Sequence, residues 1–507
     1  MSKLKLASIL LLGATLIFKV SSMLREMSIA YLFGDSYITG AYQAAFVLPN
    51  MIILFLITGM KDSFVPSYIH SLTENRHKTH LTQIFKGTAW IGLAITILGV
   101  VLSPYLVGLL YPDFKPAAEE VAVTVSRIYF AMIAFVALNA VLEGLLDAQQ
   151  KFSFSVLSQV IVVVSTIGGG FLFHSSIGIY GFATGFGIGT VVSLIIKLGY
   201  FIPQRLVQWK DKIEWKEIKS YYLVFLPVGL TVMVGQINLL IDTIFANTYG
   251  ANVVAYLNYA KSLVHFPQAI FGVTIGTIVL PILSKAVAKK DNKIFNMGIE
   301  RGLTSMYLIL FPSVLGMLVL MPNIIALVYE RGAFGEQATI ATSSMAVMYI
   351  GSVLFYSLHQ VVIKAFYSLQ KGHIILKIGL LSIVLKVILN FIFTEWIGYT
   401  GIALASSVVG AFYVGICFIL LIRITGNFPF KKIGKELFKI TTCGMIMYVA
   451  VTYSLSGLNE LNLNNLFIIM IIAAIGAIIY GICIFLFKIE AVSFLLKRSK
   501  NEIETTN

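Results

Sequence analysis

Long apolar segments follow one another along the whole chain, separated by short polar connections. Each is about 20 residues or longer, the length at which an α-helix crosses the hydrocarbon core of a bilayer. Backbone groups in lipid must be paired within a helix or a closed barrel, and segments of this length favour helices. We therefore predict an all-α polytopic membrane protein with fourteen transmembrane helices. The predicted helices are residues 6–32, 38–60, 84–111, 121–147, 153–174, 178–203, 220–247, 252–284, 299–328, 337–367, 374–394, 399–423, 436–456 and 464–487.

The composition excludes a water-soluble fold. Of the 507 residues, 58% are hydrophobic and 12% are charged, whereas soluble domains carry about 25% charged residues. The first apolar segment is too long for a cleaved signal peptide, so we expect it to be the first span. The three cysteines lie within apolar segments, which indicates packing residues and no disulfide framework. They are Cys417, Cys443 and Cys483.

Basic residues gather in alternate connections, Lys61 and Lys151 among them, whereas the opposite connections offer only Lys115 and Arg331. Because lysine and arginine are enriched in cytoplasmic loops, both termini are predicted to be cytoplasmic. This asymmetry explains the net charge of +14, and no nucleic-acid partner is expected. The basic segment after residue 487 is predicted to lie on anionic membrane lipids.

The two halves of the chain resemble each other. The motif Ile-Gly-x-x-Gly-x-Ala at residues 177–183 recurs at residues 397–403, and Gln150-Lys151 recurs as Gln370-Lys371. Helices 1–6 and 7–12 are therefore predicted to be two six-helix lobes of equal orientation, related by a pseudo-two-fold axis along the membrane normal. Such repeats are typical of alternating-access transporters with a substrate site between the lobes. The predicted parts are an N-lobe at 1–215, a C-lobe at 216–430, helices 13 and 14 at 431–487 and a basic cytoplasmic tail at 488–507.

Helix 1 carries a polar stripe inside its predicted span. Thr15, Lys19, Ser22 and Glu26 follow helical spacing, with Arg25 at the edge of the stripe. A charge at the bilayer centre costs about 2.5–3.5 kcal/mol on insertion scales, so such residues face a cavity or a partner. We predict that the stripe lines a hydrated cavity in which Arg25 and Glu26 partly neutralise each other. Internal ion pairing alone is the alternative.

Other predicted spans carry similar stripes. Helix 8 presents Lys261 and His265, helix 7 presents Asp242, and helix 11 presents Lys386 and Asn390. A cavity lined by lysine and arginine would be cationic. Such a cavity suits a pyrophosphate, which lysine binds as a point charge and arginine as a fork.

Two further charges, Arg127 and Lys197, lie near predicted helix ends and are predicted to extend to the lipid headgroups. The sequence shows no phosphate-binding loop, no metal-ligand cluster and no catalytic domain. We therefore predict a transporter and not an enzyme, with no cofactor. Coupling to the membrane potential, to sodium or to protons stays open.

A series of motifs links the chain to a known family. It begins with Leu-Arg-Glu-x-x-x-Ala-x-x-Phe-Gly at residues 24–34 and Phe-x-Leu-Pro-Asn at residues 46–50. It continues with Gln-Ile-Asn-Leu-Leu-Ile-Asp-Thr at residues 236–243 and Arg-Gly-Ala-Phe at residues 331–334. Together, over roughly residues 5–425, these motifs resemble the MurJ lipid II flippase family of the multidrug/oligosaccharidyl-lipid/polysaccharide exporter superfamily. Members of that family have fourteen helices.

The resemblance implies transport of lipid II, an undecaprenyl-pyrophosphate-linked disaccharide pentapeptide, across the bacterial cytoplasmic membrane for peptidoglycan synthesis and cell shape. It also implies cell-wall synthesis enzymes as partners, a cationic cavity, and a lipid-tail groove formed by helices 13 and 14. A family arginine of helix 2 falls on Ile53, a family aspartate falls on Gly40, and an Asp-Arg pair of helix 8 falls on Lys261-Ser262. The predicted substrate-binding residues are Lys19, Ser22, Arg25, Asn50, Lys261 and His265.

Some members of the family place a sodium ion between helices 7 and 11. Asp242 matches the helix 7 carboxylate, Asn390 stands where a second acid occurs, and Lys386 takes a neighbouring ligand position. We hypothesise that the Lys386 ammonium pairs with Asp242 and makes transport sodium-independent. Sodium bound at Asp242, or two residues that face different cavities, are the alternatives.

Three other functions stay open. The nearest is a flippase for another polyprenyl-pyrophosphate-linked glycan, such as a teichoic-acid or capsule unit. A cation-coupled drug exporter would need an acidic and aromatic site. A non-transporting scaffold for wall synthesis would leave the charged stripes without a role.

Overall fold

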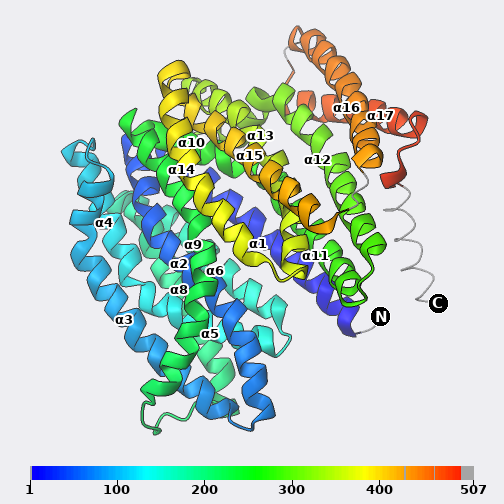
Figure 1. The fold of residues 1–507 in the computed structure, drawn as a ribbon. Helices are drawn as coiled ribbons and strands as arrows, with labels where there is room; N and C mark the ends of the chain where they lie inside the picture. The colour runs from blue at the N-terminus through cyan, green and yellow to red at the C-terminus, as the bar shows by residue number, and fades with distance from the viewer. Residues whose placement is uncertain (1–2, 427–429, 462, 493–507) are drawn as a thin grey trace. The chain divides into compact units, whose positions relative to one another are not determined.

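The computed structural model describes residues 3–426, 430–461 and 463–492, and within these ranges every regular element is helical (Figure 1). Residues 493–507 of the predicted basic tail therefore lie outside the described residues. The helices are α1 Lys3–Phe33, α2 Tyr37–Thr73, α3 His77–Leu110, α4 Pro116–Ala131, α5 Ile133–Ala148, α6 Phe152–Leu172, α7 His174–Ile177, α8 Tyr180–Phe201, η1 Ile202–Gln204, α9 Trp215–Thr248, α10 Ala251–Val264, α11 Phe266–Ala288, α12 Asn292–Tyr329, α13 Glu336–Ser368, α14 Gly372–Ile397, α15 Thr400–Thr425, α16 Phe430–Asn459 and α17 Asn465–Leu486.

These helices follow the fourteen predicted spans. Among the residues that the structure describes, ten helices are long and apolar enough to cross a membrane, and two bent pairs bring the number to twelve. One pair is α4 with α5, bent by 42° around Met132, and the other comprises the two parts of α9, Trp215–Leu230 and Val232–Thr248, bent by 44°. The two remaining predicted spans coincide with α1 and with the successive helices α10 and α11.

Several helices extend beyond the predicted spans. Helix α2 continues to Thr73, thirteen residues past the predicted end at residue 60, so Lys61 lies within a helix and not in a connection. Hydropathy marks the part of a helix that lies in lipid, whereas the backbone hydrogen bonds of the helix continue into the polar region. The break between α10 and α11 falls at His265, two residues before Pro267, which lacks a backbone donor and fits the first turn of a helix.

The internal repeat is visible in the backbone. Gln150 and Gly178 have positive φ angles of 60° and 57°, and Gln370 and Gly398, each 220 positions later, have 57° and 66°. The helix boundaries repeat at the same offset, because α5 and α13 end at Ala148 and Ser368. The repeated turn motifs thus fix the same helix ends in both copies.

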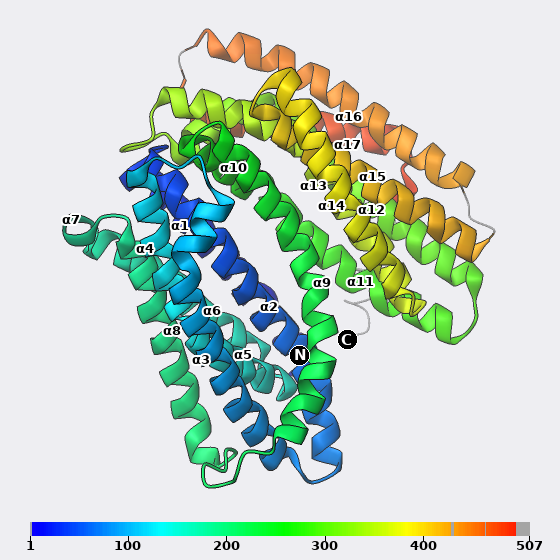
Figure 2. The ribbon, with the colours of Figure 1, turned by 60° about the vertical axis from the view of Figure 1, so that its left-hand side comes forward.

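The chain divides into two compact units. Unit 1 comprises Met1–Asn258 and Arg331–Phe334, and unit 2 comprises Tyr259–Glu330 and Gly335–Asn507. In unit 1, α2 packs on α4, α5 and α9, while α6 packs on α1 and α8. In unit 2, α13 packs on α11, α12 and α15, and α16 and α17 pack on each other and on α12 (Figure 2). The predicted lobe boundaries at residues 215 and 430 rest on the sequence repeat and stay a prediction.

Glycines let α6 and α8 approach closely. A Cβ atom at Gly185 would lie 2.4 Å from the Ser165 carbonyl oxygen, and one at Gly169 would lie 2.5 Å from the Gly181 carbonyl oxygen. No side chain fits at either position without a shift of the backbone. These glycines of α6 and α8 therefore form the surface on which the two helices meet.

Candidate functional site

The polar stripe of α1 lies on a partly exposed face within unit 1. Lys19, Ser22 and Arg25 are all half-buried. The Ser22 hydroxyl donates to the Phe18 carbonyl at 2.9 Å, so it is satisfied within its own helix. Within the described part of unit 1, Lys19 has no ion-pair partner. Its ammonium is thus one positive charge of this stripe that no carboxylate of unit 1 neutralises.

Arg25 and Glu26 neutralise each other, as predicted. The Arg25 Nη2 atom lies 2.6 Å from Glu26 Oε1, and Nε donates to the same oxygen at 3.2 Å. On α2, the Gln43 amide donates to the other Glu26 oxygen at 3.5 Å. The guanidinium also lies 5.6 Å from the centre of the Phe46 ring. These contacts fix the direction of Arg25 and leave part of its fork exposed.

An aromatic group that the sequence did not reveal supports Arg25. The Tyr42 and Tyr129 hydroxyls are 2.6 Å apart, and the Phe46 and Tyr129 rings are 4.7 Å apart. Asn50, the predicted α2 residue, is half-buried one helical turn after Phe46. Tyr129 belongs to α4, 104 residues after Arg25 in the sequence, so no local pattern could have indicated this contact.

In unit 2, Lys261 and His265 lie one turn apart at the end of α10, and both are half-buried. His265 occupies the break before α11, where its Nδ1 atom is hydrogen-bonded to Gln268 Oε1 at 2.5 Å and its ring meets Tyr349 edge-on at 5.3 Å. Lys261 and His265 belong to unit 2, whereas the predicted residues of α1 and α2 belong to unit 1. The meeting of all six predicted substrate-binding residues in one cavity therefore stays a prediction.

The three predicted ion-coupling residues are all buried. Asp242 of α9 is 2% exposed and belongs to unit 1, while Lys386 and Asn390 of α14 belong to unit 2. Pairing of Lys386 with Asp242 stays a prediction.

Oxygen atoms of α15 hold the Lys386 ammonium. It donates to the Ile402 carbonyl at 3.3 Å and to the Ser406 hydroxyl. A carbonyl and a hydroxyl oxygen are also the kind of ligands that bind hard metal cations. The tethered ammonium thus occupies a site built from cation-binding oxygens.

A buried charge cluster in unit 1 was not predicted. We call Lys61, Glu143, Asp147 and Lys197, which come from α2, α5 and α8, the α5 charge cluster. Glu143 Oε1 accepts from Lys197 at 2.8 Å, and Glu143 Oε2 lies 3.1 Å from the Lys61 ammonium. Lys61 also lies 3.7 Å from Asp147.

The burial of Lys197 corrects one expectation. Its side chain is 0% exposed, so the prediction that it reaches the lipid headgroups is wrong. Asn139 and Ser193 accept hydrogen bonds from its ammonium at 2.7 and 3.1 Å. Arg127, by contrast, is exposed. Lys197 points into the bundle because Glu143, 54 residues earlier in the chain, supplies an opposite charge there.

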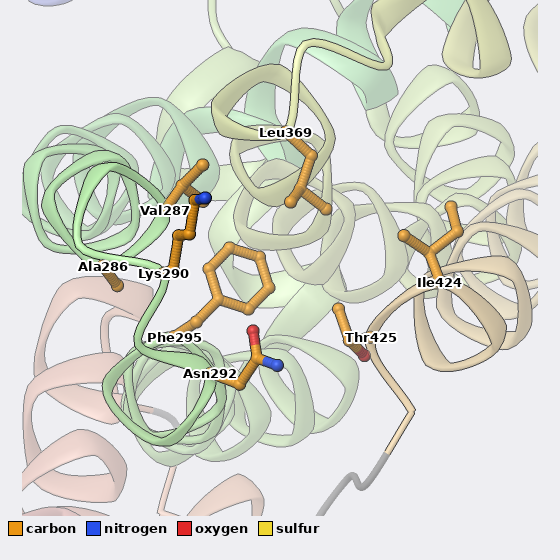
Figure 3. A pocket seen from close by; sticks show the side chains of 8 residues that line it. All are labelled: Ala286, Val287, Lys290, Asn292, Phe295, Leu369, Ile424 and Thr425. Atoms are coloured by element: carbon orange, nitrogen blue, oxygen red, sulfur yellow. The ribbon is translucent and has the colours of Figure 1, made fainter.

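A separate cavity of about 260 Å³ lies in unit 2, where the connection between α11 and α12 meets the ends of α13 and α15 (Figure 3). One ammonium, one amide and one hydroxyl contribute polar atoms to the wall, and the other lining side chains are apolar. The lining residues are Ala286, Val287, Lys290, Asn292, Phe295, Leu369, Ile424 and Thr425. None of the predicted substrate-binding residues lines this cavity.

The remaining candidate groups are metal ligands and cysteine thiols. Within the part of the chain that the structure describes, no three His, Cys, Asp or Glu residues are grouped so as to hold a metal ion. The three cysteines are buried and unpaired, which confirms their predicted place in the packing.

Comparison with known proteins agrees with this arrangement. A family model described as "Lipid II flippase MurJ" matches residues 29–477. The chain is 25% identical over 491 residues to a lipid II flippase MurJ of Burkholderia cenocepacia, covering 92% of this chain and 94% of that protein. It is 24% identical over 493 residues to a probable lipid II flippase MurJ of Aquifex aeolicus, covering 96% and 95% of the two chains.

Solved structures give the same result. A structure titled lipid II flippase MurJ in the inward closed conformation matches with a TM-score of 0.81 and 25% identity, over 94% of this chain and 98% of that one. An inward-facing multidrug resistance MATE family transporter matches with a TM-score of 0.68 and 14% identity, over 84% and 99% of the two chains. The second match shows a shared fold only.

Proposed function

Because the chain belongs to the MurJ family of lipid II flippases, we propose that it carries lipid II from the inner to the outer leaflet of the bacterial cytoplasmic membrane. The protein is a multi-pass membrane transporter and not an enzyme. The observation that carries the substrate assignment is the cationic face of α1, with Lys19 and a partly exposed Arg25. A lipid-linked pyrophosphate is an anion of the kind that this face attracts.

The proposed transport cycle is alternating access. Lys19 and Arg25 bind the pyrophosphate, with Ser22 and Asn50 beside them, and Lys261 and His265 complete the site from the second repeat. The polyprenyl tail stays in lipid, along α16 and α17. The two lobes then reorient so that the head group reaches the outer leaflet. No covalent step is involved.

Replacement of the resident lipid II flippase of a bacterium tests this function. The parent chain is expected to restore growth and the exposure of lipid II on the outer leaflet when the resident protein is depleted. A Lys19→Ala/Arg25→Ala variant is expected to fail at equal expression, because the two cations of the polar stripe are lost. An Arg127→Ala variant is the matched control, since Arg127 is an exposed cation of α4.

The outcomes distinguish lipid II transport from the remaining functions. Absence of rescue by a well-expressed parent would contradict lipid II transport and favour a different polyprenyl-linked glycan. Rescue by the double variant would contradict the cationic site and favour a scaffold. A drug exporter would rescue in neither form.

We further propose that transport is independent of sodium, because the Lys386 ammonium occupies the oxygen site of α15. The rate of the parent in proteoliposomes is expected to be the same in sodium and in choline buffer. A Lys386→Asn variant, which removes the tethered cation, is expected to become sodium-dependent. Lys377→Asn is the control, since Lys377 is an exposed residue of α14. A parental rate that rises with sodium would rule the idea out.

The proposed orientation has both termini in the cytoplasm, so that the basic connections contact the anionic inner leaflet. Cell-wall synthesis enzymes are proposed partners, since the flipped precursor must be consumed on the outer side.

A further inference from the structure

The α5 charge cluster has no charged counterpart in the second repeat. Glu143 and Lys197 correspond to Ile363 and Cys417, 220 positions later in the sequence. Cys417 is fully buried in an apolar core of unit 2, and Ile363 packs against that core. Alignment of Pro66 inside α2 with Pro281 inside α11 matches the part of α2 around Lys61 with residues 275–279, which contain no charged residue. At matching positions, the first repeat therefore carries buried charged side chains and the second carries apolar ones.

Stability does not explain these charges. Buried ion pairs recover little more than the cost of their own desolvation, and apolar replacements of similar volume are often neutral or stabilising. The second repeat provides such a replacement within the same chain. Ionisable residues inside a membrane protein are retained mainly where they serve its function. The cluster is therefore a candidate for a role in transport.

The geometry of the cluster is asymmetric. Glu143 Oε1 accepts from Lys197 at 2.8 Å, Glu143 Oε2 accepts from the Gln159 amide at 2.7 Å, and the Glu143 side chain is 4% exposed. Lys61 is held less tightly, between Glu143 at 3.1 Å, Asp147 at 3.7 Å and the Ser155 hydroxyl at 2.9 Å. The Lys61 and Asp147 side chains are 20% and 16% exposed. The Lys197 end of the cluster is thus enclosed, whereas the Lys61 and Asp147 end is partly exposed.

The two carboxylates are arranged as successive positions along one helix. Glu143 and Asp147 are four residues apart on α5, a rise of about 6 Å along the helix axis. The ammonium of Lys61 on α2 lies within ion-pair distance of both. Because Lys61 lies between the two carboxylates, it stays paired with one of them when α2 shifts along α5 by about 3 Å in either direction. Helix shifts of about 1–2 Å are known from other switching proteins.

We propose that Glu143 and Asp147 are alternative pairing positions for Lys61, between which it moves as α2 shifts along α5 during transport. Helix α2 also carries Gln43, Phe46 and Asn50 of the candidate site, so its shift moves that site relative to α5. Lys197 is the fixed counter-charge of Glu143. All four members of the cluster are positioning residues, and the link to transport rests on the proposed function.

Transport measurements on the full chain with lipid II in proteoliposomes test the role of Asp147. An Asp147→Asn variant is expected to lower turnover about tenfold, the effect of losing one charge-assisted hydrogen bond in the shifted state. The half-saturating lipid II concentration and the melting temperature are expected to stay unchanged. An Asp147→Glu variant, which keeps the charge, is expected to restore the rate.

A variant without buried charge separates function from packing. Lys61→Met/Glu143→Leu/Lys197→Met is expected to melt at or above the parental temperature and to transport slowly. Parental turnover in this variant, or in Asp147→Asn, would overturn the proposal. If the triple variant does not fold, the result for Asp147→Asn decides alone.

A distance measurement addresses the shift without any substrate. Spin labels at Leu72→Cys on α2 and Gln150→Cys just after α5 occupy exposed positions, and the native cysteines are buried. The parent is expected to show two distance populations, and Asp147→Asn one. A single population in the parent would overturn the proposal. A parent that shows two populations but moves no lipid II would instead contradict the proposed function.

Discussion

At the scale of single residues, the charges inside the membrane-spanning bundle differ in how far the sequence reveals their partners. Arg25 and Glu26 are adjacent, so their pairing was predictable. Lys197 and Glu143 are 54 residues apart, and nothing local indicates that they meet. Hydropathy places Lys197 near a helix end, where extension to the headgroups is an ordinary solution. The direction of its side chain is set by a partner on another helix.

Removal of one charged side chain from the α5 charge cluster is expected to lower the stability of the protein more than removal of three of them. In a Glu143→Gln variant the ammonium of Lys197 remains buried without its counter-charge, at a cost of about 3–5 kcal/mol. The melting temperature in detergent is expected to fall well below that of the parent. Glu74→Gln is the control, because Glu74 is 50% exposed. An unchanged melting temperature for Glu143→Gln would show that Lys197 finds another partner.

At the scale of elements, the apolar segments predicted where the helices lie, whereas the close approach of α6 and α8 at their glycines emerged from the structure. Predicted ends were less accurate where a helix continues past the membrane, as α2 does to Thr73. The bend at Met132 and the division at His265 were not predicted, because both occur inside apolar or amphipathic stretches. Breaks of this kind depend on which neighbouring helices support the free backbone groups.

Substitution of Gly185 by alanine is expected to separate α6 from α8. The new Cβ atom would lie 2.4 Å from a backbone oxygen that cannot move by itself, and overpacking of this kind costs about 1–3 kcal/mol. Gly199→Ala on the same helix is the matched control, since no atom lies within 4 Å of its Cβ position. The measurement is the thermal unfolding of both variants in detergent. Equal melting temperatures would contradict close packing at Gly185.

At the scale of the whole molecule, the sequence repeat reappears as matched helix ends and matched left-handed turns in the two halves. The fold of the chain also matches a solved MurJ structure over 94% of its length. The interiors of the two copies nevertheless differ. The first copy contains the buried α5 charge cluster, whereas the second contains Cys417 and its apolar neighbours. A shared backbone thus accommodates two kinds of core.

The orientation in the membrane is a prediction for the complete chain. Cysteines introduced at Asp113 and Lys210 lie in exposed connections of opposite predicted sides. A membrane-impermeant maleimide is expected to label Asp113→Cys in intact spheroplasts and Lys210→Cys only after permeabilisation, because the basic connection stays inside. The reverse pattern would place the termini outside.

The sequence by itself determined the helical membrane fold, the positions of the spans, the family and the cationic face of α1. These follow from properties that act along the chain, namely hydropathy, helical spacing and local motifs. Only the tertiary structure decided that Tyr129 and Phe46 support the Arg25 region, that Lys386 binds oxygens of α15, and that Lys61 and Lys197 share Glu143. Such contacts join residues far apart in sequence, and the free energy of a buried charge depends on which partner the fold brings to it.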